Sequence, residues 1–378
     1  MARRPNILWY CTDQQRWDTI AALGNQHIDT PNIDALCGAG TAFSNAFTQC
    51  PICTPSRATM LTGRYPVAHQ VHRNGNRRFP AHEVLVTKLL ADAGYDCGLA
   101  GKLHLSAAGK MEERVDDGYR VFHWSHHPTP DYPKGHAYDD WLRNEKGVDP
   151  IELFDGLGGF CGAGVPAELH QTTWCSEMAI RFINDAKDDP FLLYIPYTAP
   201  HFPVQAHPEW AGKSDFGAYG DVVEELDYRI GEILATLETL QLDEKTIVVF
   251  LSDNGGPEPK NASDNGALRG AKGDAWEGGF RVPFAVQWKG TLPAGTVYHK
   301  PVSSLDIMGT IMDLTGAPVD PERPLDGVNL IPYLTGAEKG PPHEAIYLRK
   351  FDGGKHTVRH GDHKLIIQWK GGAPELYN

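Results

Sequence analysis

The 378-residue sequence lacks several features that would place it in a specialised class of protein. No apolar run approaches the roughly 20 residues of a membrane-spanning helix, and no apolar leader with a small-residue cleavage site precedes Asn6. Internal repeats and low-complexity tracts are absent as well. We therefore expect a soluble, folded protein without a membrane partner, located in the cytoplasm unless a leader has been removed.

Positive charge is scarce, because 35 lysines and arginines face 48 acidic residues and leave a formal net charge of −13. Nucleic acids and anionic membranes bind basic surfaces, so the charge argues against both as general partners. It does not exclude an anionic small molecule, since a local cluster of cations can form a positive pocket on an acidic body. The oligomeric state is left open.

The sequence also lacks a zinc-type cysteine array, because its seven cysteines are scattered and odd in number. Cys50 and Cys53 form one isolated C-x-x-C pair. A redox role would need a thioredoxin-like context, and none surrounds the pair. Reduced thiols are the expectation for an intracellular protein.

Buried strands alternate with helices along most of the chain. We expect strands at 6–11, 95–100, 191–195, 246–251 and 284–288, and helices at 31–37, 83–93, 167–186, 219–240 and 303–314. The alternation predicts an α/β fold with a mostly parallel sheet flanked by helices. Short strands from residue 345 onward predict a small antiparallel subdomain, so we divide the chain into residues 1–340 and a truncated 341–378.

Residues 107–165 interrupt this pattern with a stretch rich in glycine, proline, histidine and aromatic residues. We expect a long irregular insertion, and such insertions are often functional. Two interpretations remain open: the insertion determines substrate specificity, or it covers an edge of the sheet.

Polar side chains follow several expected strands at the point where each strand ends. Asp13-Gln14 and Asp253-Asn254 offer two carboxylates and two amide oxygens, which are the ligands that Ca²⁺ and Mg²⁺ prefer. Lys102, His104 and His201 follow two further strands. Because ligands bind at the carboxyl ends of parallel strands, we expect one site at this edge.

The stretch from Cys50 to Arg64 reads as the start of a helix with Cys53 at its first turn. Free backbone N–H groups and the helix dipole would lie beside Cys53, and Arg57 would face the same way one turn later. An anion site is one interpretation. A cysteine that caps a helix beside a surface arginine is the other.

Cys53-Thr54-Pro55-Ser56-Arg57 resembles the C-x-P-S-R signature of the formylglycine-dependent sulfatases, which belong to the alkaline-phosphatase-like superfamily. The resemblance extends, in order along the chain, to Asp13, Leu61–Pro66, Gly101–His104, Ala199–His201, Ser252–Gly255, Lys272, Glu277–Gly279, Arg281–Pro283 and Glu375–Tyr377. It implies an alkaline-phosphatase-like α/β fold and a metal-dependent sulfate ester hydrolase. The expected substrate is an anionic sulfated small molecule or carbohydrate.

The resemblance implies a role for each matching residue. Cys53, converted to formylglycine by a separate formylglycine-generating enzyme, would be the nucleophile. The metal, Ca²⁺ with Mg²⁺ or Mn²⁺ as alternatives, would be bound by Asp13, Gln14, Cys53, Asp253 and Asn254. Arg57 and Lys102 would hold the formylglycine and metal-side oxygens, and His104 would assist in breaking the hydrate adduct. Lys102, His201 and Lys272 would contact the substrate.

Two other functions remain open from the sequence. A phosphonate monoester or phosphodiester hydrolase would use the same formylglycine nucleophile. A metal-stabilised binding protein would keep Cys53 as a thiol. The polar cluster of Arg73, Asn74, Asn76, Arg77 and Arg78 is either close enough to reach a substrate or a solvated basic face.

Overall fold

The computed structural model describes residues 4–107, 116–127, 135–155, 161–163, 165–258, 260–369 and 371–378. Parts of the expected insertion at 107–165 therefore lie outside the described residues. Within the described ranges, no helix combines the length and apolar character needed to cross a membrane.

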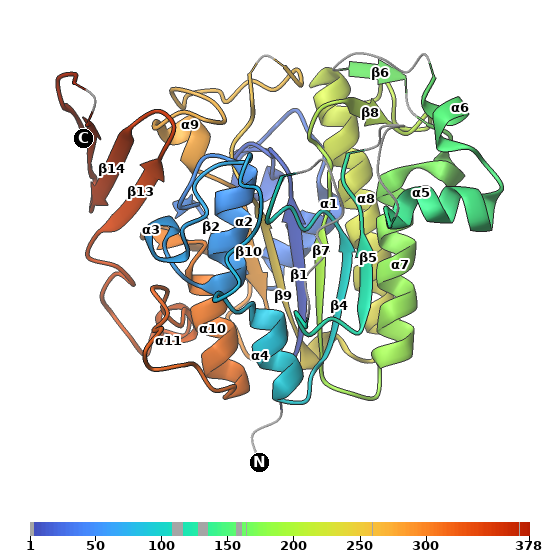
Figure 1. Cartoon of the computed structure of the whole chain (residues 1–378), viewed down its shortest axis with the longest axis horizontal. Helices are drawn as coiled ribbons and strands as arrows, with labels where there is room; N and C mark the ends of the chain where they lie inside the picture. Colours follow the sequence, from blue (N-terminus) through green and yellow to red (C-terminus); the bar gives the residue numbers. More distant parts are fainter. Residues whose placement is uncertain are drawn as a thin grey trace.

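A large central sheet forms the middle layer of the molecule (Figure 1). Its strand order is β11-β2-β10-β9-β1-β7-β4-β5, and every neighbouring pair is parallel except the two pairs that β10 makes. The strands are β1 (Asn6–Thr12), β2 (Thr41–Phe43), β4 (Asp96–Gly101), β5 (Val121–Trp124), β7 (Phe191–Pro196), β9 (Thr246–Ser252), β10 (Phe284–Gln287) and β11 (Thr296–Tyr298). Two short parallel pairs, β3 (Ala46–Phe47) with β12 (Val302–Ser303) and β6 (Cys161–Ala163) with β8 (Val204–Ala206), lie outside it.

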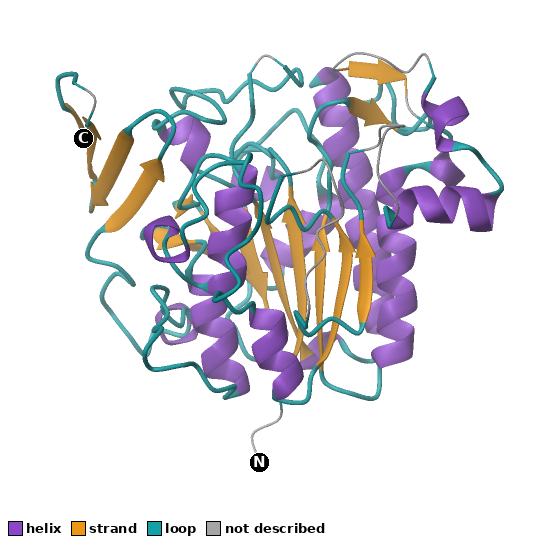
Figure 2. Cartoon of the chain, viewed as in Figure 1, coloured by secondary structure: helices purple, strands orange, loops and turns teal. Residues whose placement is uncertain are grey.

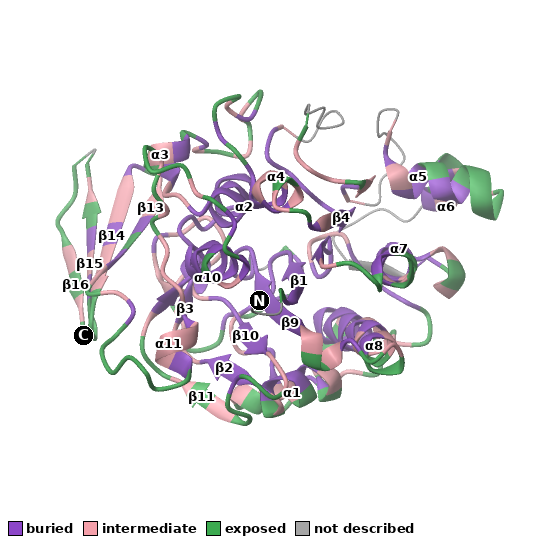
Figure 3. Cartoon of the chain, turned by 90° about the horizontal axis from the view of Figure 1, so that it is seen from below, coloured by how far each residue is buried: buried purple, intermediate pink, exposed green. Residues whose placement is uncertain are grey.

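Helices cover both faces of this sheet, as Figures 2 and 3 show. One face packs against α2 (Cys53–Thr62), α4 (Val86–Asp92) and α10 (Asp306–Thr315), and the other against α1 (Pro31–Gly38), α7 (Gln171–Ala186) and α8 (Gly217–Thr239). Successive residues of β1 point to opposite faces, so Trp9 joins one core and Tyr10 the other. The predicted α/β fold with a mostly parallel sheet is confirmed.

Smaller helices occupy the connections between these elements. They are α3 (Pro66–His69), α5 (Ala137–Trp141), α6 (Pro150–Phe154), α9 (Glu277–Phe280), α11 (Ile331–Leu334), the 3₁₀ helices η1 (Ala21–Leu23), η3 (Ala167–Leu169) and η4 (Asp243–Lys245), and the π-helical turn η2 (Leu142–Lys146). The prediction of an irregular stretch over 107–165 was wrong for the short elements α5, η2, α6 and β6. It was also wrong for Val121–Trp124, which pairs in parallel with β4 as β5. This strand is mostly half-buried at the sheet edge, so it lacks the apolar run that marks the central strands.

The C-terminal residues form the expected antiparallel sheet, in the order β13 (Ile346–Lys350), β14 (Lys355–His360), β15 (His363–Gln368) and β16 (Glu375–Tyr377). Glu277 of α9 ties this sheet to the main body, because its carboxylate lies 2.9 Å from Lys364 Nζ and 3.4 Å from Arg359 Nη1. The indole N–H of Trp276 donates to Glu375 at 3.1 Å. The C-terminal sheet is thereby fixed beside α9.

Candidate active site

Cys53 is the first residue of α2 and is almost completely buried. The preceding residue, Ile52, is extended, and its carbonyl accepts the first backbone hydrogen bond of the helix from Ser56 N–H at 3.2 Å. The helix ends at Gly63, which adopts the left-handed conformation with φ of 65°. The predicted placement of Cys53 at a helix N-terminus therefore agrees with the structure.

Asp13-Gln14 and Asp253-Asn254 meet beside this cysteine because β1 and β9 are parallel neighbours, with Thr12 opposite Ser252. The Cys53 thiol donates to Asp13 Oδ1 at 3.4 Å, and Asn254 Nδ2 donates to the Cys53 sulfur at 3.5 Å. The backbone N–H of Gln14 donates to Asp253 Oδ1 at 3.2 Å. The two strand ends and the helix thus converge on one point.

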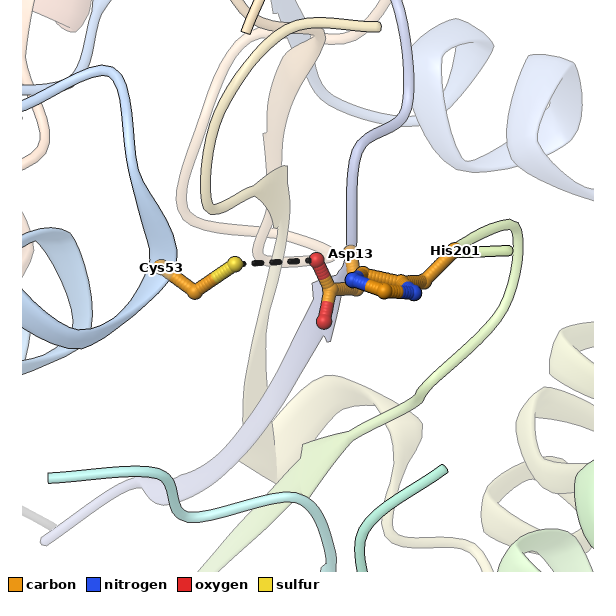
Figure 4. A group of neighbouring side chains, drawn as sticks. All are labelled: Asp13, Cys53 and His201. Carbon is orange, nitrogen blue, oxygen red and sulfur yellow. Dashed lines mark hydrogen bonds between the residues drawn. The ribbon is translucent and has the colours of Figure 1, made fainter. Parts of the chain in front are cut away.

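The donor set of this cluster fits a hard divalent cation. Among the described residues, the buried oxygens Gln14 Oε1 and Asn254 Oδ1 have no hydrogen-bond partner. An unpaired buried oxygen is costly, and a cation would satisfy both atoms while neutralising the adjacent carboxylates. Asp13, Cys53 and His201 also place ligand atoms within 4.8 Å of one another, and Figure 4 shows these three side chains pointing together. His201, which the resemblance predicts to contact the substrate, therefore lies beside the residues predicted to bind the metal.

Two buried cations hold the carboxylates in place. Arg57 Nε lies 2.8 Å from Asp253 Oδ2, and its Nη2 lies 3.4 Å from Asp13 Oδ2. Lys102 Nζ forms an ion pair with the same Asp13 oxygen. Burial raises the pKa of Asp13, but the neighbouring cations, Lys102 foremost, outweigh burial and hold that pKa well below its ordinary range. Asp13 is therefore a permanent carboxylate at neutral pH.

Lys272 approaches the cysteine from the loop that precedes α9, and its Nζ donates to the Cys53 sulfur at 3.0 Å. Burial, with Asp13 and Asp253 adding to it, raises the pKa of the Cys53 thiol. The unmodified side chain is consequently a neutral thiol at neutral pH and a poor nucleophile.

Lys102 reaches the site through a sharp turn at the end of β4. Gly101 has a φ of 132°, and a Cβ at this position would lie 2.2 Å from the carbonyl oxygen of Pro196. Only glycine permits this approach, which allows Lys102 N–H to donate to the same carbonyl at 2.7 Å. The local sequence Gly-Lys thus directs the lysine toward Asp13.

Four histidine side chains form one group beside Lys102. The His201 ring stacks on His127 with centroids 3.8 Å apart, and the rings of His104 and His126 lie edge to face at 4.7 Å. Burial, together with neighbouring cations, lowers the pKa of all four imidazoles well below the ordinary value. They are neutral bases at neutral pH.

His126 and His127 are site residues that the sequence interpretation did not assign. Lys102 Nζ donates to His127 Nε2 at 3.4 Å, so His127 belongs to the cluster. Both histidines follow the end of β5. The rule that polar residues gather at strand ends would have identified them if β5 had been recognised as a strand.

Comparisons with known proteins agree with this geometry. Residues 5–317 match the family model described as Sulfatase. The chain belongs to the sulfatase family. Human arylsulfatase A is 32% identical to this sulfatase over 404 residues, which cover 99% of the chain and 76% of the relative. The family relationship makes the chain a sulfuric ester hydrolase.

Solved structures resemble this sulfatase over its whole length. One, described as Ps i-CgsB in complex with k-i-k-neocarrahexaose, is 29% identical with a TM-score of 0.79, covering 99% of this chain and 86% of that chain. The phosphonate monoester hydrolase of Agrobacterium radiobacter has the same TM-score at 21% identity, with coverage of 99% and 89%. At this identity, the second likeness concerns the fold alone.

Proposed function

We propose that this sulfatase cleaves a sulfate monoester with a formylglycine nucleophile formed from Cys53 and with one divalent cation. The observation that carries the proposal is the set of contacts around the Cys53 sulfur, which lies 3.0–3.5 Å from Lys272, Asp13 and Asn254. A neutral thiol forms only weak hydrogen bonds with such groups. An aldehyde hydrate, which has two hydroxyl groups, fits them because donors and acceptors are both within reach.

The cation would be held by Asp13, Gln14, Asp253 and Asn254, and we propose Ca²⁺, with Mg²⁺ or Mn²⁺ as alternatives. When bound, it would withdraw charge from the sulfuryl oxygens and favour ionisation of the nucleophilic hydroxyl. The oxygen-rich ligand set supports a hard cation over zinc.

The remaining roles belong to the side chains of this chain. The ammonium group of Lys272 contacts Cys53 and that of Lys102 contacts the neighbouring Asp13, and both would stabilise the negative charge that develops on the sulfuryl oxygens. Arg57 would hold the two carboxylates apart at fixed geometry, because its guanidinium contacts both. His201 would face the leaving oxygen, and His104, as a neutral base, would accept a proton from the second hydroxyl of the hydrate.

We propose a sulfated carbohydrate as the substrate class, with aryl sulfates as usable surrogates. The similar structure of Ps i-CgsB, a complex with the oligosaccharide k-i-k-neocarrahexaose, supports this class. The names of the relatives also include arylsulfatases.

The test is a mass measurement combined with a substrate panel. Protein produced together with a formylglycine-generating enzyme should carry an aldehyde at position 53, detected by peptide mass and by reaction with a hydrazide. It should hydrolyse 4-nitrophenyl sulfate, and Cys53→Ala should abolish turnover while leaving the circular dichroism spectrum unchanged. A higher kcat/KM on phosphonate monoesters or phosphodiesters than on any sulfate ester would replace the proposal with the phosphorus-ester alternative.

A further inference from the structure

Arg349 lies at the end of β13, next to the loop that joins β13 to β14. Its guanidinium carbon is 4.9 Å from the ring centroid of Phe351 and 5.4 Å from that of Trp369. Arg73, from the polar cluster noted in the sequence, packs on the same Phe351 ring at 5.1 Å. Two guanidinium groups therefore pack against one aromatic side chain, that of Phe351.

The two arginines differ in how their charges are balanced. Arg73 Nε lies 3.4 Å from Asp352 Oδ1, in a pair that is half-exposed. Arg349 forms no ion pair or side-chain hydrogen bond with any residue that the structure describes, and its buried Nε has no acceptor there. Burial lowers the pKa of the Arg349 guanidinium, as expected for a partly desolvated cation without a carboxylate. Arg349 is therefore a fixed positive charge that lacks an anion.

Three contacts connect this region to the active site. The backbone N–H of Arg349 donates to the backbone carbonyl of Gln49 at 3.0 Å, and Gln49 lies four residues before Cys53. The His72 ring stacks on Phe351 with centroids 4.6 Å apart. Close to His72 in the chain, Asn74 accepts a hydrogen bond from Thr54 N–H at 3.0 Å, directly after Cys53.

On the other side, Lys350 Nζ lies 3.7 Å from where a Cβ of Gly273 would stand, next to Lys272. Figure 1 shows the β13–β14 loop at the same end of the molecule as α9. The end of β13 that carries Arg349 therefore lies beside both the segment that precedes Cys53 and the loop that carries Lys272.

We propose that Arg349, supported by Phe351 and Arg73, binds a second anionic group of the substrate, so that the enzyme selects carbohydrates carrying a further sulfate or a carboxylate beside the scissile sulfate. This inference rests on the proposed function and narrows its substrate class. A planar guanidinium suits either anion, because its N–H groups form paired hydrogen bonds with two oxygens.

A groove of about 390 Å³ beside Arg349 gives the carbohydrate ring a place to lie. Its walls are largely apolar, with Tyr65, Val67 and Tyr347 among the residues that form them, and Arg349 and His356 also line it. Sugar rings pair apolar C–H faces with polar edges. A wall of apolar side chains beside one unpaired cation therefore fits an anionic saccharide better than an uncharged or a purely apolar ligand.

Calorimetric binding to the full-length Cys53→Ala protein, which cannot turn over its ligands, tests the proposal at low salt. Two ligand pairs distinguish a second sulfate from a carboxylate. Glucosamine 2-N,6-O-disulfate is compared with N-acetylglucosamine 6-O-sulfate, and an unsaturated chondroitin 6-sulfate disaccharide is compared with N-acetylgalactosamine 6-sulfate. We expect the dianionic member of at least one pair to bind about tenfold more tightly, and Arg349→Gln to remove that preference. Arg349→Lys should restore part of it.

The matched control is Arg143→Gln, an exposed arginine beside α5 on the opposite side of the molecule, which should leave the preference intact. A parent protein without preference in either pair would overturn the inference, as would an unchanged preference in Arg349→Gln. Thermal unfolding of each variant checks that the fold is retained. Turnover of 4-nitrophenyl sulfate by protein with Cys53 intact is measured in parallel. Absence of turnover would contradict the proposed function, whereas the ratios of binding constants would still test the role of Arg349.

Discussion

The Nζ atom of Lys272 lies 3.0 Å from the sulfur of Cys53, although 219 positions separate the two residues in the chain. Two backbone hydrogen bonds hold the loop that carries the lysine near the cysteine. The backbone N–H of Lys272 donates to the carbonyl of Gly256 at 2.9 Å, and that of Gly273 donates to the carbonyl of Pro51 at 2.8 Å. The loop is therefore attached to both partners of the site, the end of β9 and the start of α2.

Replacing this lysine tests its role in charge stabilisation. Lys272→Met should lower kcat/KM for 4-nitrophenyl sulfate by about 10²–10³, because one preorganised cation is removed from the position of the developing charge. Lys187→Met, which alters an exposed lysine at the C-terminal end of α7, is the control and should change the rate little. A decrease of equal size in both variants would contradict the assignment.

Arg57 offers a test of the buried charge network. Arg57→Met leaves Asp13 and Asp253 without their shared guanidinium, and loss of one partner from a buried ion pair costs about 3–5 kcal/mol. We expect the free energy of unfolding, measured in urea, to fall by that amount, and turnover to be lost. A stability close to that of the parent protein would show that Arg57 does not balance these carboxylates.

Divalent cations should stabilise the folded protein. Removal of metal with EDTA should lower the melting temperature, and Ca²⁺ added at about 100 times its Kd should raise the free energy of unfolding by about 2.7 kcal/mol. Asp253→Asn should greatly reduce this response, whereas Asp185→Asn, on the outer surface of α7, should preserve it. A melting temperature that is indifferent to EDTA and to Ca²⁺, Mg²⁺ and Mn²⁺ would refute the metal site.

The buried His170–Glu225 pair predicts a pH dependence of stability. Its Nδ1 and Oε1 atoms are 2.9 Å apart. Burial lowers the pKa of His170, but Glu225 outweighs burial and raises it; conversely, burial raises the pKa of Glu225, but His170 outweighs burial and lowers it. His170 therefore stabilises the fold below its ordinary pKa of about 6.5, and this contribution is lost as the pH rises through the higher folded value.

Glu225 contributes stability above about pH 4.3, and that part is lost as the pH falls through its lower folded pKa. The pair is thus fully effective between these two values. Urea unfolding across the pH range should show stability declining above pH 6.5, and the double variant His170→Gln with Glu225→Gln should show a weaker decline. Parallel pH curves for the two proteins would argue against the pair.

The sequence was sufficient for the parts of this protein that depend on local pattern. The apolar runs of β1 and β9 marked central strands, and Asp13 and Asp253 stood out because each follows such a run. The helix start at Cys53 was visible from the residues around Pro55. Edge elements were harder, because β5 is mostly half-buried and its composition does not distinguish a strand from a loop; His126 and His127 were left unassigned for that reason.

Hydrophobic periodicity and helix signals are local, so they were sufficient to predict the kind of fold and the residue types available for chemistry. Which of these residues come into contact depended on the folded arrangement of the whole chain. The parallel alignment of β1 with β9 brings two acidic residues 240 positions apart to one cysteine, and the packing of the C-terminal sheet leaves Arg349 unpaired among the described residues. Contacts of this kind depend on the order of the strands in the sheet and on the positions of the loops, and both result from packing across the whole chain.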